Sequence, residues 1–129
     1  MGSTALDRVR EFLDVFESGD VERLRELCDP QVRWLNERSG EWEAGVEPLI
    51  EYNRAALEGA NGMRAELLDP ETYEAGDQAV VSGRLVFHAT WGGEQYEIPC
   101  PSTFVARRTG DGWRIIYEHA LEYRPRESA

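Results

Sequence analysis

Lysine is absent from this chain of 129 residues, whose fourteen basic side chains are all arginines. The protein therefore cannot form a lysine Schiff base or use a lysine as a general base. Cysteine is scarce as well, with only Cys28 and Cys100. Because the two lie far apart and lack metal-ligand spacing, we expect two small buried thiols, and neither a disulfide nor a metal site.

Long apolar runs are missing too. No segment approaches the length of a membrane span, and the first residues lack the basic and then apolar pattern of a signal peptide, so we expect a cytoplasmic protein. The net charge of −11 argues against partners that attract basic patches, and we expect no nucleic acid and no membrane partner. No glycine-rich phosphate loop, internal repeat or linker is found, and residues 1–129 are predicted to form one domain.

The most informative segment lies between Thr103 and His119. Apolar and polar residues alternate on both sides of the turn at Gly110-Asp111-Gly112, which predicts two long antiparallel strands. At period two, one face of the second strand carries Trp113, Ile115, Tyr117, His119 and Leu121. A histidine and a tyrosine on an otherwise apolar face indicate a sheet that lines a cavity.

The rest of the chain predicts an α+β fold, with helices first and an antiparallel meander afterwards. Apolar stripes, caps and Pro48 predict helices over residues 4–18, 20–27 and 46–58. A polar loop through Ser39-Gly40 precedes the last of them. Alternation predicts strands over residues 31–35, 63–74, 78–91, 95–108 and 113–123, with a bend or bulge at Asp69-Pro70. The helical side chains expected to face the sheet are Phe12, Phe16, Leu49 and Ile50.

Two patterns resemble the nuclear-transport-factor-2-like superfamily, in the branch of SnoaL-like proteins and the association domains of calcium/calmodulin-dependent kinases. The first is GDVERLRELCDPQV over residues 19–32. The second comprises Thr103, Val105, Arg107-Arg108, the glycine turn, Trp113-Arg114-Ile115 and His119, supported by Gly45 and Tyr52. The resemblance implies a strongly curved sheet that wraps around helices and leaves a conical pocket. It implies little about function, because this fold hosts isomerases, dehydratases, cyclases, hydrolases and non-enzymes.

Departures from the family patterns indicate a pocket of a different character. The acid–base residues of the steroid isomerases fall near Phe12, near Trp34 and near Phe104 or Val105, so that proton shuttle is not carried over. By the same matching, the pocket histidine of the kinase association domains becomes Leu49, whereas one pocket arginine is retained as Arg84. The resemblance therefore implies an apolar and aromatic pocket, suited to an apolar or aromatic ligand better than to a small carboxylate.

His119 is the candidate catalytic residue, because histidine titrates near neutral pH and can act as an acid or a base. The alternative is a core histidine that only holds the sheet. Asn53 interrupts an apolar helical stripe, so its amide must meet either a backbone group or a ligand. Arg84 is placed at the cavity by the family matching; its partner would be a ligand's acid group or a glutamate, Glu118 or Glu66.

Three aromatic residues complete the predicted site, in which Trp34 and Phe104 hold an apolar ring and Tyr117, or Asn53, polarises a carbonyl or hydroxyl group. The substrate-binding set is thus Trp34, Asn53, Arg84, Phe104 and Tyr117. His88 and His119 lack the spacing of metal ligands, and no metal is expected.

Two functions remain open. The first is a SnoaL-like protein that binds a small apolar or aromatic molecule, either without turnover or as an isomerase, cyclase or lyase that needs no cofactor. The second is a non-catalytic self-association domain. In either case a homodimer is expected through the outer face of the sheet, which is predicted to carry Val105, Arg107, Arg114, Ile116 and Glu118.

Overall fold

Helix α1 (Ala5–Ser18) begins and ends where the sequence supplies caps. In the computed structural model, which describes residues 3–58, 62–110 and 112–120, Asp7 N donates to the Thr4 hydroxyl (3.0 Å) and Thr4 N donates to Asp7 Oδ2 (3.0 Å). This reciprocal capping box confirms the prediction. Gly19 ends the helix in the left-handed conformation, at φ 76°, and its N–H donates to Val15 O.

The remaining elements follow the predicted order, with strand β2 as an additional element. A short 3₁₀ turn, η1 (Val21–Arg23), leads into α2 (Leu24–Leu27), and α3 spans Val46–Glu58 as predicted. The strands are β1 (Cys28–Asn36), β2 (Glu41–Ala44), β3 (Met63–Ala75), β4 (Gln78–Trp91), β5 (Glu94–Thr109) and β6 (Gly112–Ala120). Strand β2 was predicted as loop; its side chains are mostly exposed and lack the apolar alternation that marks a strand. The predicted extension of the last strand beyond Ala120, including Leu121, lies outside the described residues.

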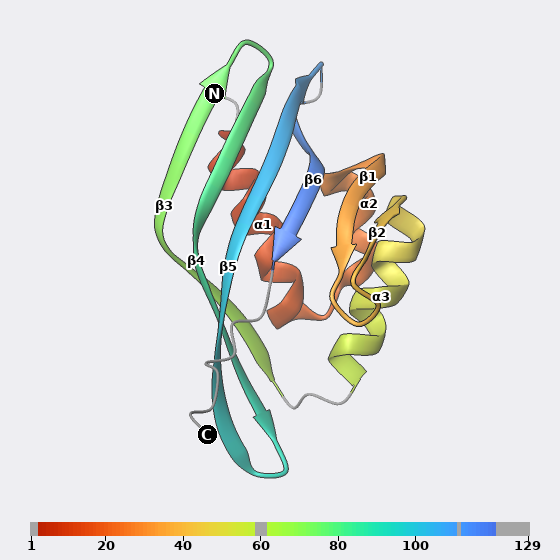
Figure 1. The fold of residues 1–129 in the computed structure, drawn as a ribbon, viewed down its shortest axis with the longest axis vertical. Coiled ribbons are helices and arrows are strands. Elements are labelled where there is room, and N and C mark those ends of the chain that lie inside the picture. Colours follow the sequence, from red (N-terminus) through yellow and green to blue (C-terminus); the bar gives the residue numbers. More distant parts are fainter. Residues whose placement is uncertain (1–2, 59–61, 111, 121–129) are drawn as a thin grey trace.

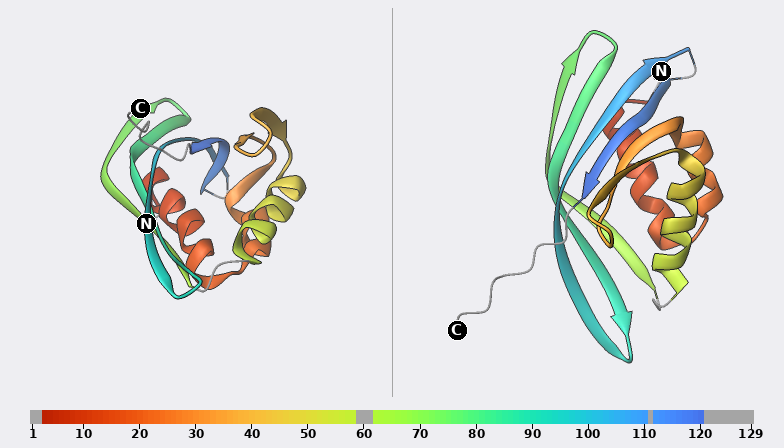
Figure 2. Two further views of the ribbon diagram at one scale, coloured as in Figure 1. Left: turned by 60° about the horizontal axis from the view of Figure 1, so that its bottom comes forward. Right: turned by 45° about the vertical axis from the view of Figure 1, so that its right-hand side comes forward.

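The six strands form one sheet in the order β2-β1-β6-β5-β4-β3. Every neighbouring pair is antiparallel except β1 and β6, which run parallel. The sheet curves strongly, and the helices lie on its concave side (Figures 1 and 2). The predicted α+β fold is confirmed, with the correction that the sheet is mostly rather than wholly antiparallel. Among the described residues, no helix is both long and apolar enough to span a bilayer.

The curvature of the sheet is accompanied by irregular pairing at β3. The register of β3 against β4 shifts between Leu68 and Glu71, and Asp69 takes a positive φ of 50°. This confirms the irregularity predicted at Asp69-Pro70. Across from it, a Cβ at Gly83 would lie 2.8 Å from Leu67 Cδ1 and 3.1 Å from Leu68 O, so glycine permits the two strands to approach at the bend.

A second irregularity lies in β6 and has larger consequences. Val105 of β5 pairs with Tyr117, whereas the next residue, Ala106, pairs with Ile115. Ile116 is therefore an extra residue in β6, a β-bulge. Because side chains alternate between the two faces of a strand, the extra residue exchanges the faces of all the residues that follow it.

The core fills the space between the helices and the concave face of the sheet. Phe12 packs edge-on against Phe104 at a ring-centroid distance of 5.5 Å, and Phe16 packs against Phe87 at 5.0 Å. Leu49 and Ile50 of α3 are buried in the same core. The prediction that these helical residues face the sheet is confirmed.

The capping box can be tested by replacing its hydroxyl. Thr4→Ala leaves the N–H groups of the first turn of α1 without the side-chain acceptor, and we expect it to lower the free energy of unfolding by about 1 kcal/mol. Thr4→Ser retains the hydroxyl, and its free energy of unfolding should remain within a few tenths of a kcal/mol of that of the parent protein. Urea unfolding followed by circular dichroism measures both; equal losses for the two variants would show that the cap contributes nothing.

Candidate functional site

A pocket of about 480 Å³ opens between α1, α3 and the concave face of the sheet. This volume is in the range of sites for small organic molecules. Its wall is mainly apolar, and the apolar lining residues are Phe12, Phe16, Leu35, Leu49, Ala56, Met63, Phe87, Ile98, Cys100 and Ala120. Five polar side chains interrupt this lining: Glu37, Arg38, Tyr52, Asn53 and Glu118. An apolar ligand body with one polar group fits such a wall.

Glu118 reaches the pocket because of the bulge. It pairs with the inward-facing Phe104 of β5 and with the buried Trp34 of β1. Burial among these neighbours, followed by the nearby charge of Glu37, raises the pKa of the Glu118 carboxyl from its ordinary value of 4.5 to about 8. Among the described residues, no hydrogen bond or opposite charge offsets this rise. At neutral pH Glu118 is therefore mainly a neutral acid that faces the pocket.

Tyr52 stands between two other flat groups on the α3 side of the pocket. Its ring lies 5.0 Å from the Trp34 ring, and the Arg38 guanidinium lies 5.1 Å from its centroid. Trp34 is in turn held by a hydrogen bond from its Nε1 to Gly45 O (3.1 Å). Burial, followed by the charge of Glu37, raises the pKa of the Tyr52 hydroxyl, so it stays protonated over the physiological range.

Asn53 is buried and lines the pocket from α3. Its Nδ2 donates to Leu49 O, one turn earlier in the same helix, at 3.1 Å. This contact answers the question left open by the sequence in favour of a backbone partner for the amide nitrogen. The amide oxygen and the second N–H are left to meet a ligand.

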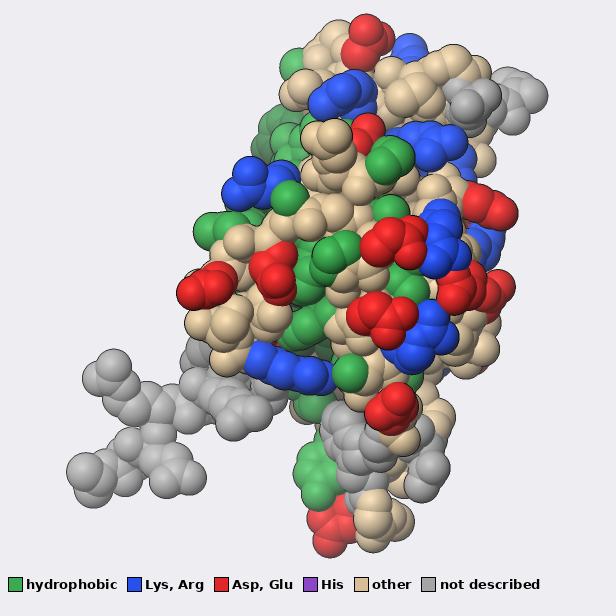
Figure 3. All heavy atoms as spheres, turned by 90° about the vertical axis from the view of Figure 1, so that its right-hand side faces the viewer, with side chains coloured by type: hydrophobic (Ala, Val, Ile, Leu, Met, Phe, Trp, Pro, Cys, Tyr) green, Lys and Arg blue, Asp and Glu red, His purple; other side chains and the backbone are tan. Residues whose placement is uncertain are grey.

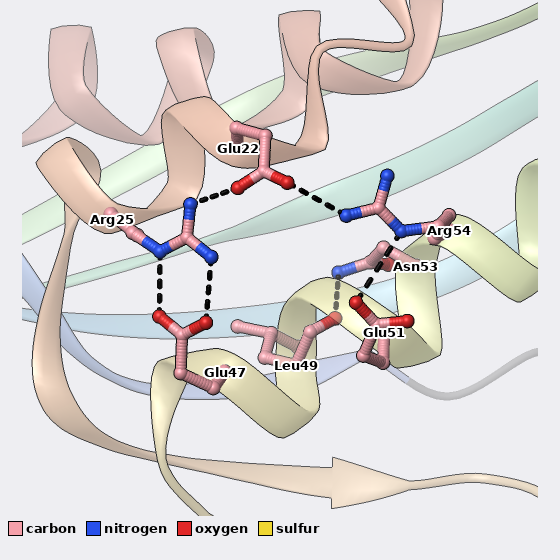
Figure 4. Close-up of polar contacts among 7 residues, drawn as sticks. All are labelled: Glu22, Arg25, Glu47, Leu49, Glu51, Asn53 and Arg54. Atoms are coloured by element: carbon pink, nitrogen blue, oxygen red, sulfur yellow. Dashed lines mark hydrogen bonds and ion pairs between the residues drawn. The ribbon is translucent and has the colours of Figure 1, made fainter.

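Helix α3, which carries Tyr52 and Asn53, is tied to η1 and α2 by ion pairs (Figure 4). Arg25 binds Glu47 in a bidentate contact, with Nε to Oε2 and Nη2 to Oε1 both at 2.6 Å, and also pairs with Glu22. Glu22 also accepts from Arg54 Nη2 at 2.8 Å. Figure 3 shows the same side of the molecule, where acidic and basic side chains lie next to one another. The pairs are exposed, so their main effect is on the orientation of α3 rather than on stability.

The predicted placement of His119 and Tyr117 in the cavity is wrong. Beyond the bulge these two residues turn to the outer face, where the Trp42 ring lies 5.1 Å from Tyr117 and 5.6 Å from His119. Neither residue lines the pocket. The same reversal corrects the predicted outer face, because Glu118 points inward and Ile116 is the bulged residue, whereas Val105 does lie outside.

Arg84 is also placed differently from the prediction. Leu85 of β4 is buried in the core, so its neighbour Arg84 points outward, and Arg84 Nη2 binds Asp69 Oδ2 at 2.8 Å. The partner is thus neither Glu118 nor Glu66, and the ion pair is an exposed surface pair. Glu66 instead contacts the outward-facing His88, with Oε1 3.3 Å from Nε2.

Of the six predicted site residues, only Asn53 lines the pocket. Trp34 and Phe104 face the concave side but are fully buried in the core, where Trp34 supports Tyr52 and Phe104 contacts Phe12. The aromatic rings that line the pocket are instead those of Phe12, Phe16, Tyr52 and Phe87. No group of three or more potential metal ligands is found among the residues that the structure describes.

The polar residues that the sequence reasoning missed are Glu37, Arg38, Tyr52 and Glu118. One signal could have identified Glu118: the adjacent Ile115 and Ile116 break the alternation of β6 and mark a place where the register can slip. Glu37 and Arg38 follow β1 directly in a polar turn, and nothing in that turn predicts a pocket.

Both cysteines are buried thiols outside any disulfide, as predicted. Burial raises the pKa of the Cys28 thiol strongly, so it is no nucleophile at neutral pH. Cys100 lines the pocket and gives it one polarizable wall position.

Comparisons with known proteins agree with this geometry. A family model described as SnoaL-like domain matches residues 6–120. A nuclear transport factor 2-like superfamily protein from Salmonella enterica superimposes with a TM-score of 0.80 at 18% identity, covering 92% of this chain and 88% of that one. The CamKII hub homology domain of Chlamydomonas reinhardtii gives 0.80 at 21% identity, with 92% and 95% covered.

A third similar structure is a Streptomyces avermitilis protein of the NTF2-like family whose name suggests a dehydratase, with a TM-score of 0.81 at 19% identity and coverage of 92% and 93%. No curated protein matches the chain. At these identities the likenesses show the fold alone, and they confirm the predicted cone-shaped architecture.

The titration of Glu118 should be visible in the stability of the protein. Between pH 4.5 and about 8 the folded state retains a proton that the unfolded state has released, so stability should fall as the pH rises through this window. Glu118→Gln cannot titrate at this position. As the pH rises, its free energy of unfolding should therefore increase relative to that of the parent protein by up to about 1.4 kcal/mol per pH unit. Urea unfolding at pH 5, 6, 7 and 8 measures the difference.

An exposed glutamate provides the control for this measurement. Glu41→Gln, in the exposed strand β2, should keep a constant offset from the parent protein over the same pH range. A constant offset for Glu118→Gln as well would mean that the Glu118 carboxyl titrates normally.

Proposed function

The chain belongs to the SnoaL-like family. From the composition of its pocket we propose that it binds a small apolar or aromatic molecule and that Glu118 transfers a proton to or from this molecule. The observation that carries the proposal is the Glu118 carboxyl, whose pKa is raised to about 8, in a mainly apolar pocket of about 480 Å³. A carboxyl group held close to neutrality is suited to general acid–base catalysis.

The proton transfer uses groups of the chain itself. As an acid, Glu118 would protonate a carbonyl or hydroxyl oxygen of the bound molecule; as a carboxylate, it would remove a proton from a carbon next to a carbonyl. Such steps underlie isomerisation, cyclisation and dehydration. A similar structure whose name suggests a dehydratase supports this range of reactions.

Tyr52 and Asn53 would orient the reacting group. The Tyr52 hydroxyl stays protonated and can donate a hydrogen bond to an oxygen that gains negative charge. Asn53 offers its amide oxygen, because its nitrogen is bound to Leu49 O. The phenylalanine rings at positions 12, 16 and 87 would hold the apolar body of the molecule.

Deuterium exchange of a ketone probe tests the acid–base role. The protein should accelerate incorporation of deuterium next to the carbonyl of 2-tetralone in D₂O, followed by proton NMR. Glu118→Gln should lower the accelerated rate by about 10²-fold, because it removes the proton-transferring group.

His119→Gln is the matched control, because it changes the outer face and should leave the exchange rate unchanged. Loss of exchange in His119→Gln with normal exchange in Glu118→Gln would reverse the assignment. Native mass spectrometry of freshly purified protein gives an independent view of a co-purifying ligand.

A second function, self-association, is favoured by a row of apolar side chains on the outer face of the sheet. Tyr73 pairs with Val80, Val80 with Val105, and Val105 with Tyr117, so the four lie in line across β3, β4, β5 and β6. Tyr73 is 68% exposed and Val80 37%, and Trp42, 43% exposed, extends the row over Tyr117. We propose a homodimer through this outer row; likeness to a hub homology domain supports it.

Mass photometry and light scattering test the dimer. The parent protein should have twice the mass of one chain at micromolar concentration. Val80→Glu places a charge in the centre of the outer row and should shift the population to monomer, whereas Gln95→Glu at the exposed β4–β5 end should not. A monomer mass for the parent protein would contradict self-association.

A further inference from the structure

The polar side chains that face the pocket include oxygen atoms that can accept hydrogen bonds from a ligand. One N–H of the buried Asn53 donates to Leu49 O, which leaves the amide oxygen and the second N–H to meet a ligand. Glu118 adds a carboxyl group, which accepts hydrogen bonds once it is ionised. The Tyr52 hydroxyl can donate as well as accept. A ligand that brings hydrogen-bond donors can therefore be bound by the Asn53 oxygen and the ionised Glu118 carboxyl.

The charges of the pocket favour a cation in the same way. Two glutamates line it against one arginine, Arg38, whose guanidinium lies over the Tyr52 ring at the exposed β1–β2 turn. The whole chain carries a net charge of −11, which adds a long-range field of the same sign. The rings of Phe12, Phe16 and Phe87 offer faces that attract a cation as well as an apolar body.

These observations converge on one chemical class. Resting on the proposed ligand pocket, we propose that the ligand is an amine that binds as its ammonium ion, with Glu118 as the counter-ion and an apolar or aromatic body against the phenylalanine rings. The ammonium N–H groups would meet the Glu118 carboxylate and the Asn53 oxygen. A buried carboxylate that gains a cationic partner forms a strong, charge-assisted hydrogen bond.

Binding of the ammonium ion changes the state of Glu118. Without ligand, its carboxyl is kept neutral by burial and by Glu37. The cation favours the carboxylate, so Glu118 loses its proton to solvent as the ligand binds. The titratable groups that interact with it are Glu37 of the β1–β2 turn, Tyr52 of α3 and Cys28 of β1. Arg38 and Cys100 line the same pocket. The ligand's own charge would thereby convert Glu118 from an acid into the base that removes a proton.

Three probes with one bicyclic body and different polar groups test this inference: 2-aminotetralin, 2-tetralol and tetralin-2-carboxylate. Calorimetry at pH 7 should show the amine binding about tenfold or more tightly than the alcohol, and the carboxylate most weakly. In buffers of different ionisation enthalpy the amine should release about one proton per molecule bound, and the alcohol none. Amine affinity should also weaken as the pH falls from 8 to 6, because less Glu118 is ionised.

Glu118→Gln is the diagnostic variant, and Glu41→Gln is its exposed control. Glu118→Gln should abolish the amine's advantage and the proton release while alcohol binding persists, which also shows that the variant folds. The alcohol binding as tightly as the amine, without proton release, would overturn the amine inference and leave the pocket function standing. If Phe87→Arg, which should block the pocket, affects the binding of none of the probes, the pocket function fails as well.

Discussion

The face on which each residue of β6 lies depends on one extra residue. A regular strand would have continued the inward series of Trp113 and Ile115 to Tyr117 and His119. The bulge at Ile116 shifts the series, so that Glu118 and Ala120 line the pocket instead. A titratable carboxyl, rather than an imidazole, thus enters the apolar space, and the same residues that exclude water from it keep it neutral.

The charged residues of the chain are divided between two environments. On the outer surface, arginines and glutamates satisfy one another, as in the bidentate contact of Arg25 with Glu47, and such pairs gain little because water competes for them. In the pocket, Glu118 lacks such a partner within the described residues, and burial makes its state sensitive to any charge that arrives. The surface ion pairs orient helix α3, which forms one side of the pocket, and Glu118 is the group that can react with a ligand.

Local signals in the sequence were sufficient for most of the fold. The Thr4 cap, the stripe of α3 and the proline at position 70 each act over a few residues, and the structure has the corresponding elements where they predict them. Asn53 was identified for the same reason, since a polar residue within an apolar helical stripe is a local anomaly. Strand β2 was missed because an exposed edge strand needs no apolar alternation.

The side-chain parity of β6 could not be read locally. It is decided by how β5 pairs with β6 on either side of Ile116, and that pairing is a property of the assembled sheet. All site residues placed by parity on that strand were therefore reversed together. Arg84 failed through the family matching, which carried over a residue type without the direction of its side chain.

The parallel pairing of β1 with β6 has a consequence for how the protein is made. Strand β1 is translated long before its neighbour β6, which is supplied only when residues 112–120 have been made. Until then one long edge of β1 has no strand to bind, and the contact that finally joins them closes most of the chain into a single loop. The nascent protein must therefore wait for its last strand with an open sheet, which makes that interval the period when a chaperone or a neighbouring chain can compete for the edge.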